Sequence, residues 1–190
     1  SRSIKRFQEK IDTLRRPSIP VSDADVLPEA RLARYSGNIP RYALQRGLTI
    51  ESCRRWELGY DKGRGRLVFP IRRYDGKLVG LTGRILPSAE KQAEAAGVKV
   101  SKYHNYVGLD KTKYLFGEHL LEHKKPIVLC EGQIDVILTF QQLGIHAVAP
   151  LGEGFSKTHV KTISAFDPPV VYVFPDNDPP GRMGAEKFVY

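Results

Sequence analysis

Short apolar segments alternate with helical segments from Ile127 to the end of the chain, and this alternation limits the possible folds more than any other feature. It predicts three strands, "IVLC" (127–130), "IHAVAP" (145–150) and "PVVYVF" (169–174), and three helices, "EGQIDVILTFQQLG" (131–144), "SKTHVKTISAF" (156–166) and one that begins in "GRMGAEKFVY" (181–190). Gly144 closes the first helix and Ser156 caps the second. Strands and helices that alternate with short links predict a parallel sheet covered by helices, and nearly continuous apolar strands are typical of burial on both faces.

Four carboxylates lie where these strands end. Glu131 directly follows the first strand, Asp135 comes one helical turn later, and Asp176 and Asp178 follow the third strand. Ligands of parallel sheets bind at the carboxyl ends of the strands, so we expect these side chains at one edge. Clustered carboxylates repel one another unless a divalent cation neutralises them, and oxygen-only ligands suit Mg²⁺ or Mn²⁺. The pattern therefore predicts a metal site for phosphoryl transfer.

A plainer interpretation of the Asp-x-Asp segment stays open. Asp176 would be a turn residue that accepts backbone hydrogen bonds before Pro179-Pro180-Gly181. The acid and glycine after the first strand, followed by Asp-x-Asp after the third, favour the metal site.

The chain before residue 126 has a different character. The segment "RLVFPIRRYDGKLVGLTGRIL" (66–86) predicts a β-hairpin around Asp75-Gly76. Residues 28–37 and 39–60 predict short helices, residues 1–16 an amphipathic helix before a proline-rich linker, and residues 87–101 a loop or a short helix.

Charge divides the chain at about the same place. Lysine and arginine number 30 against 21 acids, but residues 1–125 hold 26 of the basic residues and 14 of the acids. A basic half favours a polyanionic partner such as nucleic acid, although a solvated basic surface has the same composition.

Other function classes find no support in the sequence. No apolar run approaches the roughly 20 residues of a membrane span, and no signal peptide is recognisable, so we expect a cytoplasmic protein without a membrane partner. Cys53 and Cys130 lack metal-ligand spacing, which predicts two plain thiols and no zinc. A phosphate loop of the helicase type is also missing.

The segments "PIVLCEGQIDVILTFQQLGIHAVAPLGEG" and "VVYVFPDNDPPGRMGAEK" resemble the TOPRIM domain of primases, topoisomerases, nucleases and recombination factors. Upstream, "YALQRGLTIESCRRWELGY", "RLVFPIRRYDGKLVGLTGRIL" and "KYHNYVGLDKTKYLFG" are similar to the amino-terminal lobe of bacterial-type (DnaG-type) DNA primases. A phage or plasmid primase, or a primase-helicase, is one source that the resemblance leaves open. The resemblance implies an α/β fold with three parts. A helix and linker (1–35) come first, followed by a basic mixed α+β lobe with a β-hairpin (36–125). The last part (126–190) is a TOPRIM domain with a parallel sheet flanked by helices, which we expect to be incomplete at its carboxyl end.

The resemblance also assigns roles to individual residues. Glu131 is similar to the family's catalytic glutamate, Asp135 to its neighbouring acid, and Asp176 and Asp178 to its metal-binding pair. The resemblance implies that all four acids bind metal and that Glu131, Asp176 and Asp178 are catalytic. Positions that contact template or nucleotide are occupied here by Arg46, Arg84, Lys102, Tyr103 and Lys111, with Lys113 as a competitor for the role of Lys111. Gly152 and Gly154 match the glycine loop after the second strand.

The activity that this resemblance implies is synthesis of short RNA primers on single-stranded DNA. The expected partners are the DNA template, ribonucleoside triphosphates and a replicative helicase, and the expected cofactor is Mg²⁺ or Mn²⁺, as two ions. Two alternatives stay open: another TOPRIM enzyme, such as a metal-dependent nuclease or nicking factor, and a non-catalytic nucleic-acid-binding module.

Overall fold

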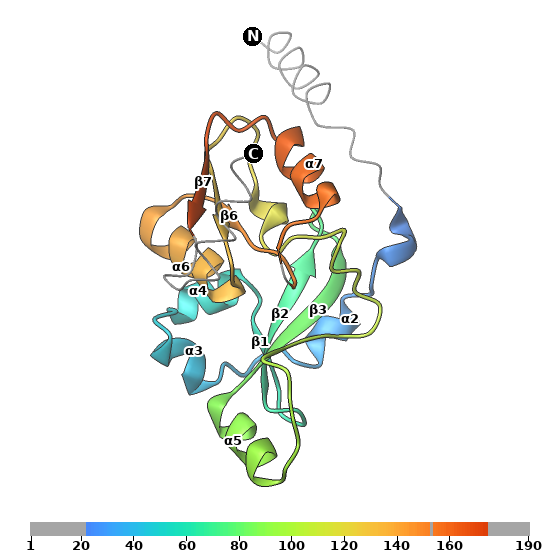
Figure 1. Cartoon of the computed structure of the whole chain (residues 1–190), viewed down its shortest axis with the longest axis vertical. Coiled ribbons are helices and arrows are strands. Elements are labelled where there is room, and N and C mark those ends of the chain that lie inside the picture. Colours follow the sequence, from blue (N-terminus) through green and yellow to red (C-terminus); the bar gives the residue numbers. More distant parts are fainter. Residues whose placement is uncertain (1–21, 153, 175–190) are drawn as a thin grey trace.

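A computed structural model describes residues 22–152 and 154–174 of the chain. The expected helices over 1–16 and 181–190 lie outside the described residues, as do Asp176 and Asp178. The described chain contains two sheets, one antiparallel and one parallel, with helices packed around both (Figure 1). No helix among the described residues combines the length and the apolar character needed to cross a membrane.

The first sheet contains four antiparallel strands in the order of the chain. They are β1 (Gly59–Asp61), β2 (Arg66–Arg72), β3 (Leu78–Ile85) and β4 (Tyr103–Asn105). The predicted hairpin is confirmed as β2 and β3, with Gly76 at φ 85° in the turn, a conformation that favours glycine. Strands β1 and β4 were not predicted, because three residues are too few to show an alternating pattern.

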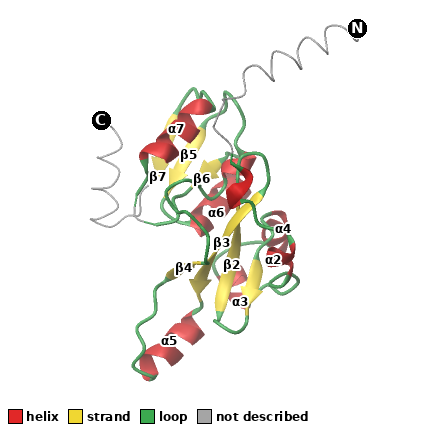
Figure 2. Cartoon of the chain, turned by 90° about the vertical axis from the view of Figure 1, so that its right-hand side faces the viewer, coloured by secondary structure: helices red, strands yellow, loops and turns green. Residues whose placement is uncertain are grey.

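Short helices precede, separate and follow the strands of this sheet along the chain. They are the 3₁₀ turn η1 (Asp23–Asp25), α2 (Ala30–Ala33), α3 (Arg41–Gln45), α4 (Ile50–Arg55), α5 (Pro87–Ala95) and a second 3₁₀ turn, η2 (Glu118–Leu120). Thr49 begins α4 by accepting a hydrogen bond from the Ser52 amide at 3.0 Å. Residues 87–101, which the sequence left as a loop or a short helix, contain α5, which extends away from the rest of the molecule in Figure 2.

The second sheet confirms the predicted strand and helix alternation. It contains β5 (Ile127–Cys130), β6 (Ala147–Val148) and β7 (Val171–Phe174), in the order β6-β5-β7 and all parallel, with α6 (Gln133–Leu143) and α7 (Lys157–Ala165) as connections. Gly144 ends α6 at φ 66°, and Ser156 caps α7.

The expectation that each strand of this sheet is buried on both faces is wrong for β7. All four residues of β5 are buried, whereas Tyr172 and Phe174 of β7 are 45% and 48% exposed. Strand β5 lies between two neighbours, but β7 pairs only with β5 among the described strands, so less of its surface is covered.

One hydrophobic core joins the two sheets. Phe116 stacks on Trp56 with ring centroids 5.0 Å apart and meets Phe69 of β2 edge-on at 5.7 Å. The same cluster includes Val128 of β5 and Ile134 of α6. The domain boundaries at residues 35 and 125 stay predictions. Residues on both sides of residue 125 belong to this one core.

A buried carboxyl group near this core makes stability depend on pH. Glu118 is 2% exposed and accepts hydrogen bonds from the amides of Leu115 (2.8 Å) and Tyr74 (3.2 Å). Burial raises the pKa of Glu118 to about 8, so the folded protein keeps the proton over a range in which the unfolded chain loses it. Stability is therefore lost as the pH rises from the unfolded pKa through the folded one.

We expect the urea midpoint of Glu118→Gln to rise relative to that of the wild type between pH 5 and pH 8; the comparison cancels the opposite contributions of His119 and His159, whose pKa values burial lowers. The amide of glutamine cannot ionise, so the stability of the variant should change less with pH, although its Nε2 cannot accept and one of the two hydrogen bonds is lost. Equal pH dependence of the two proteins would contradict an ionising role for Glu118.

Candidate active site at the edge of the parallel sheet

The end of β5 and the start of α6 bring Glu131 and Asp135 to one edge of the parallel sheet. Glu131 directly follows β5 and is exposed, and Asp135 lies in the first turn of α6, where the helix dipole favours a negative charge. Between them, Gly132 is the residue that starts the helix. A β-carbon at Gly132 would lie only 2.7 Å from Asp135 Oδ2, so glycine is needed for the carboxylate to occupy this position.

The strand that carries the Asp-x-Asp segment is the direct neighbour of β5. Cys130 and Phe174, the last residues of β5 and β7, are partners in the parallel register. The two strands therefore end level with each other, as the prediction of a shared edge requires. Asp176 and Asp178 lie two and four residues beyond Phe174 in the sequence, outside the described residues.

Arg84 and Tyr103 approach this edge from the antiparallel sheet. They are register partners on β3 and β4, and Arg84 Nη1 donates to the Tyr103 hydroxyl at 3.1 Å. The Tyr103 hydroxyl would be 3.8 Å from a β-carbon at Gly132, which places it close to Asp135. Burial raises the pKa of the Tyr103 phenol and the Asp135 carboxylate adds to this, while Arg84 opposes it. The phenol is therefore protonated at neutral pH.

Tyr42 of α3 completes this cluster, and sequence reasoning missed it. The Arg84 guanidinium lies 5.7 Å from the Tyr42 ring centroid and 5.5 Å from that of Tyr103, within the range of cation–π attraction. Arg46 Nη1 donates to the Tyr42 hydroxyl at 3.3 Å. Arg46, Tyr42, Arg84 and Tyr103 thus form one connected group. The spacing of Tyr42 and Arg46, four residues apart at a helix end, was the available signal.

Lys111 lies against the glycine loop that follows β6. Its Nζ would be 3.3 Å from a β-carbon at Gly152, so a side chain there would displace it. Lys113, the competitor for this role, is instead paired with Asp25 at 3.0 Å. The structure therefore favours Lys111 at this edge; Gly154 lies two residues further along the loop, at φ 69°.

Two amide side chains that the sequence did not single out hold the same loop. Asn105 Nδ2 of β4 donates to the Leu151 carbonyl at 2.9 Å, and Gln133 Nε2 of α6 donates to the Pro150 carbonyl at 3.2 Å. The antiparallel sheet and α6 thereby fix the loop after β6 from two sides. No motif in the sequence marks either residue.

Lys102 directly precedes β4 and is exposed, and its carbonyl accepts from the Ile85 amide at 3.0 Å. No described contact of its side chain joins it to Arg84 or Tyr103, and its role as a template- or nucleotide-binding residue stays a prediction.

The described residues hold half of the predicted metal site. Across residues 22–152 and 154–174, no three His, Cys, Asp or Glu side chains gather as a metal-binding group. Glu131 and Asp135 offer only oxygen ligands, and Mg²⁺ typically takes one or two carboxylates together with waters and substrate phosphates. This donor chemistry fits a hard divalent cation.

Comparisons with known proteins match both parts of the chain. A family model described as Toprim-like matches residues 128–190. The DNA primase of Deinococcus radiodurans is 32% identical over 155 residues, which cover 80% of this chain and 26% of that protein. The DNA primase of Helicobacter pylori strain 26695 is 34% identical over 126 residues, or 64% of this chain and 21% of that protein. The chain thus spans about a fifth to a quarter of the curated relatives it matches.

Solved structures show the same fold at lower sequence identity. A DNA primase domain from Pseudomonas aeruginosa superposes with a TM-score of 0.67 at 24% identity, over 84% of this chain and 63% of that one. A DnaG primase catalytic domain bound to single-stranded DNA has a TM-score of 0.62 at 23% identity, over 86% and 59%. The parallel sheet and the matched region define a protein with a Toprim domain. More narrowly, the chain is similar to the DnaG-type DNA primase catalytic cores, because the antiparallel lobe is matched together with the Toprim part.

Proposed function

We propose that this chain forms the catalytic core of a DNA primase, which makes short RNA primers on single-stranded DNA by metal-dependent nucleotidyl transfer. The observation that carries the proposal is the meeting of two sheets at one edge, where Arg84 and Tyr103 from the antiparallel sheet approach Gly132 and Asp135 of the parallel one. Cations beside carboxylates suit a reaction in which phosphates are held next to bound metal ions. Sequence similarity to DNA primases and likeness to a core bound to single-stranded DNA support this choice.

The cofactor in this proposal is a divalent ion, Mg²⁺ or Mn²⁺. Glu131 and Asp135 would hold it together with Asp176 and Asp178, and when bound it would neutralise and orient phosphate oxygens of the nucleotide. Arg84, fixed between two tyrosine rings, presents its remaining N–H groups to a phosphate without having to be ordered first. Lys111 adds a positive charge beside the loop after β6.

A primer-synthesis assay tests the proposal. The 190-residue chain is incubated with single-stranded DNA, ribonucleoside triphosphates and Mg²⁺, and RNA products are separated by length. Template-dependent RNA products are expected. Cleavage of the DNA without synthesis would point instead to a nuclease or nicking enzyme, and DNA binding that never leads to turnover, with or without divalent ion, to a non-catalytic module.

Gly132→Ala tests the close approach at the start of α6. The added methyl group must displace the Asp135 carboxylate, and small misplacements of catalytic groups lower rates strongly, so we expect about 10-fold to 100-fold slower primer synthesis. Thermal stability should change little, because residue 132 has an extended conformation that alanine also adopts. The matched control is Gly63→Ala, whose β-carbon would meet its nearest neighbour at 3.6 Å. Equal activity of the two variants would contradict a need for glycine at position 132.

A further inference from the structure

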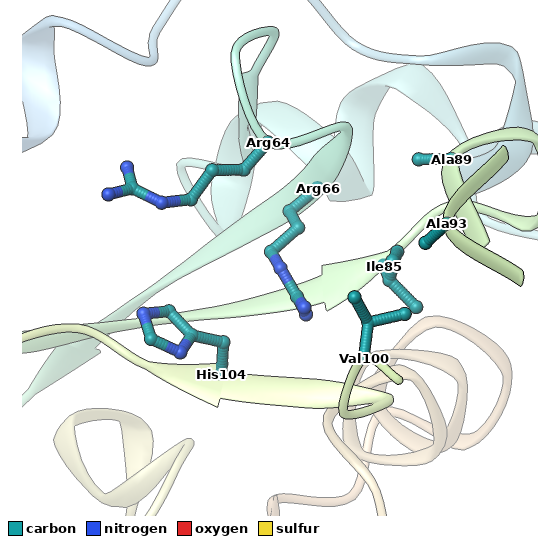
Figure 3. A pocket seen from close by; sticks show the side chains of 7 residues that line it. All are labelled: Arg64, Arg66, Ile85, Ala89, Ala93, Val100 and His104. Atoms are coloured by element: carbon teal, nitrogen blue, oxygen red, sulfur yellow. The ribbon is translucent and has the colours of Figure 1, made fainter. Parts of the chain in front are cut away.

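The pocket beside α5 has its charged groups already engaged within the chain. It has a volume of about 340 Å³ and is lined by α5 and by strands β2, β3 and β4 (Figure 3). Arg66 donates to the carbonyls of Gly83 (2.9 Å) and Ser101 (3.0 Å), and Arg64 pairs with Asp61 at 3.3 Å. These contacts hold the wall of the pocket together, and we place no ligand there.

Lys111 belongs to a tight turn, residues 110–114, which we call the Lys111 turn. Asp110 Oδ1 accepts hydrogen bonds from the amide of Thr112 at 2.9 Å and from its hydroxyl at 2.7 Å. The Lys113 amide donates to the Asp110 carbonyl at 3.2 Å. An aspartate that accepts from the backbone two residues further on forms an Asx-turn, so the Lys111 turn is organised locally. None of these bonds fixes where the turn lies relative to the parallel sheet.

The start of α7 contacts the Lys111 turn directly. Ser156, the cap of α7, accepts from the His159 amide at 3.1 Å, and His159 Nδ1 accepts from the Ser156 amide at 3.0 Å. The two residues therefore form a capping box. The Ser156 hydroxyl also donates to the Thr112 carbonyl at 2.6 Å. One hydroxyl thus caps the helix and ties it to the Lys111 turn.

His159 forms the buried side of the same contact. Its side chain is 1% exposed, and burial lowers its pKa, while the backbone of Tyr114 and Lys111 and the charge of Asp110 oppose this shift. The ring is therefore neutral at neutral pH and packs against the Lys111 turn. Nε2 carries the proton, because Nδ1 accepts, but it completes no hydrogen bond within the described part of the chain. Ser156 therefore supplies the hydrogen bond that this capping box gives to the turn.

The connection between β6 and α7 touches the Lys111 turn a second time. The Cδ and Nζ atoms of Lys111 would lie 3.2 Å and 3.3 Å from a β-carbon at Gly152, four residues before Ser156. The lysine side chain thus lies along the glycine loop while the next residue of its turn is bonded to the helix cap. The backbone contact at Ser156 sets where the lysine side chain begins.

We propose that the capping box of α7, Ser156 and His159, positions Lys111 by holding the Thr112 carbonyl, so that the lysine side chain stays against the glycine loop and presents its charge to a phosphate. This inference rests on the proposed function, in which Lys111 supplies a positive charge beside that loop. Ser156 and His159 are positioning residues, since they act through Lys111.

Ser156→Asp separates the two tasks of the serine hydroxyl. Aspartate caps a helix as well as serine does, and its charge suits a helix N-terminus, but a carboxylate cannot donate to the Thr112 carbonyl and repels it. Ser156→Thr keeps both the cap and the donor. Thr158→Asp places the same charge at an exposed position in the first turn of α7 and is the matched control.

The kinetic measurement is primer synthesis by the full 190-residue chain, with KM for ribonucleoside triphosphates and kcat determined separately. A lysine that holds a phosphate equally in the ground state and the transition state affects KM and leaves kcat unchanged. We expect Ser156→Asp to raise KM by about threefold to fivefold, the upper range for one exposed charge pair. Ser156→Thr and Thr158→Asp should keep wild-type values. A loss of folded protein alone would lower kcat without changing KM.

Combination with Lys111→Met shows whether Ser156 acts through Lys111. Lys111→Met should raise KM by itself, and Ser156→Asp should add nothing further in that background, whereas independent effects would multiply. Multiplying effects, or a wild-type KM in either single variant, would overturn the proposal.

Hydrogen exchange tests the contact without any catalytic step. The amides of Thr112 and Lys113 are hydrogen-bonded within the turn, so peptides that cover residues 108–116 report on its opening. Exchange should be faster in Ser156→Asp than in Thr158→Asp and should stay slow in Ser156→Thr. If the chain makes no primers, the proposed function fails, and this measurement still decides whether the capping box holds the turn. Equal exchange in all variants would refute the positioning role.

Discussion

Replacing Glu131 with glutamine is expected to reduce primer synthesis by about 100-fold or more, the usual cost of removing one preorganised charged or hydrogen-bonding group from a reaction centre. Glutamine keeps the size of the side chain but loses the negative charge that a divalent ion requires. Glu131 is exposed at the end of β5, so the substitution should leave folding intact. Asp176→Asn should have a similar effect for the same electrostatic reason.

The measurement is the rate of ribonucleotide incorporation on single-stranded DNA over a range of Mg²⁺ concentrations. A weakened metal site should show as a shift of the Mg²⁺ midpoint to higher concentration, which a merely structural role would not produce. Glu51→Gln, an exposed acid in the first turn of α4, serves as the control. Wild-type rates in both Glu131→Gln and Asp176→Asn would exclude the proposed metal site.

Replacing Phe116 with alanine is expected to lower the free energy of unfolding by about 3–5 kcal/mol, the range for a fully buried phenylalanine. Phe116 is 1% exposed and contacts Trp56 and Phe69 through ring stacking and an edge-on contact. These partners belong to the amino-terminal lobe, whereas the backbone of Phe116 bridges to Ala149 beyond β6. Truncation of Phe116 would therefore leave a cavity where the two sheets share their core.

Urea denaturation followed by tryptophan fluorescence measures this loss, since Trp56 is the one tryptophan of the chain and lies on Phe116. Leu44→Ala, at a side chain that is 42% exposed, is the control and should cost far less. A loss for Phe116→Ala as small as the roughly 0.5 kcal/mol of ordinary surface substitutions would show that the two sheets do not depend on this contact.

Local signals in the sequence were sufficient for much of the fold. The Asp75-Gly76 turn between apolar runs indicated the β2–β3 hairpin, because a tight turn needs a residue that tolerates positive φ. The change to alternating strands and helices after residue 126 indicated the parallel sheet, and Gly144 and Ser156 marked helix ends correctly. Strands of two or three residues, such as β4 and β6, leave too short a pattern for their bounds to be read in this way.

The order of strands, helices and acids along the chain was enough to show which carboxylates follow the strands of the parallel sheet. Which side chains of the antiparallel sheet come close to Asp135 depended on the packing of the two sheets. The β3–β4 register pairs Arg84 with Tyr103, whose hydroxyl lies close to Gly132, and the packing of α3 brings Tyr42 next to Arg84. Such contacts join residues far apart in the chain, and they depend on register and helix docking, which no local pattern encodes.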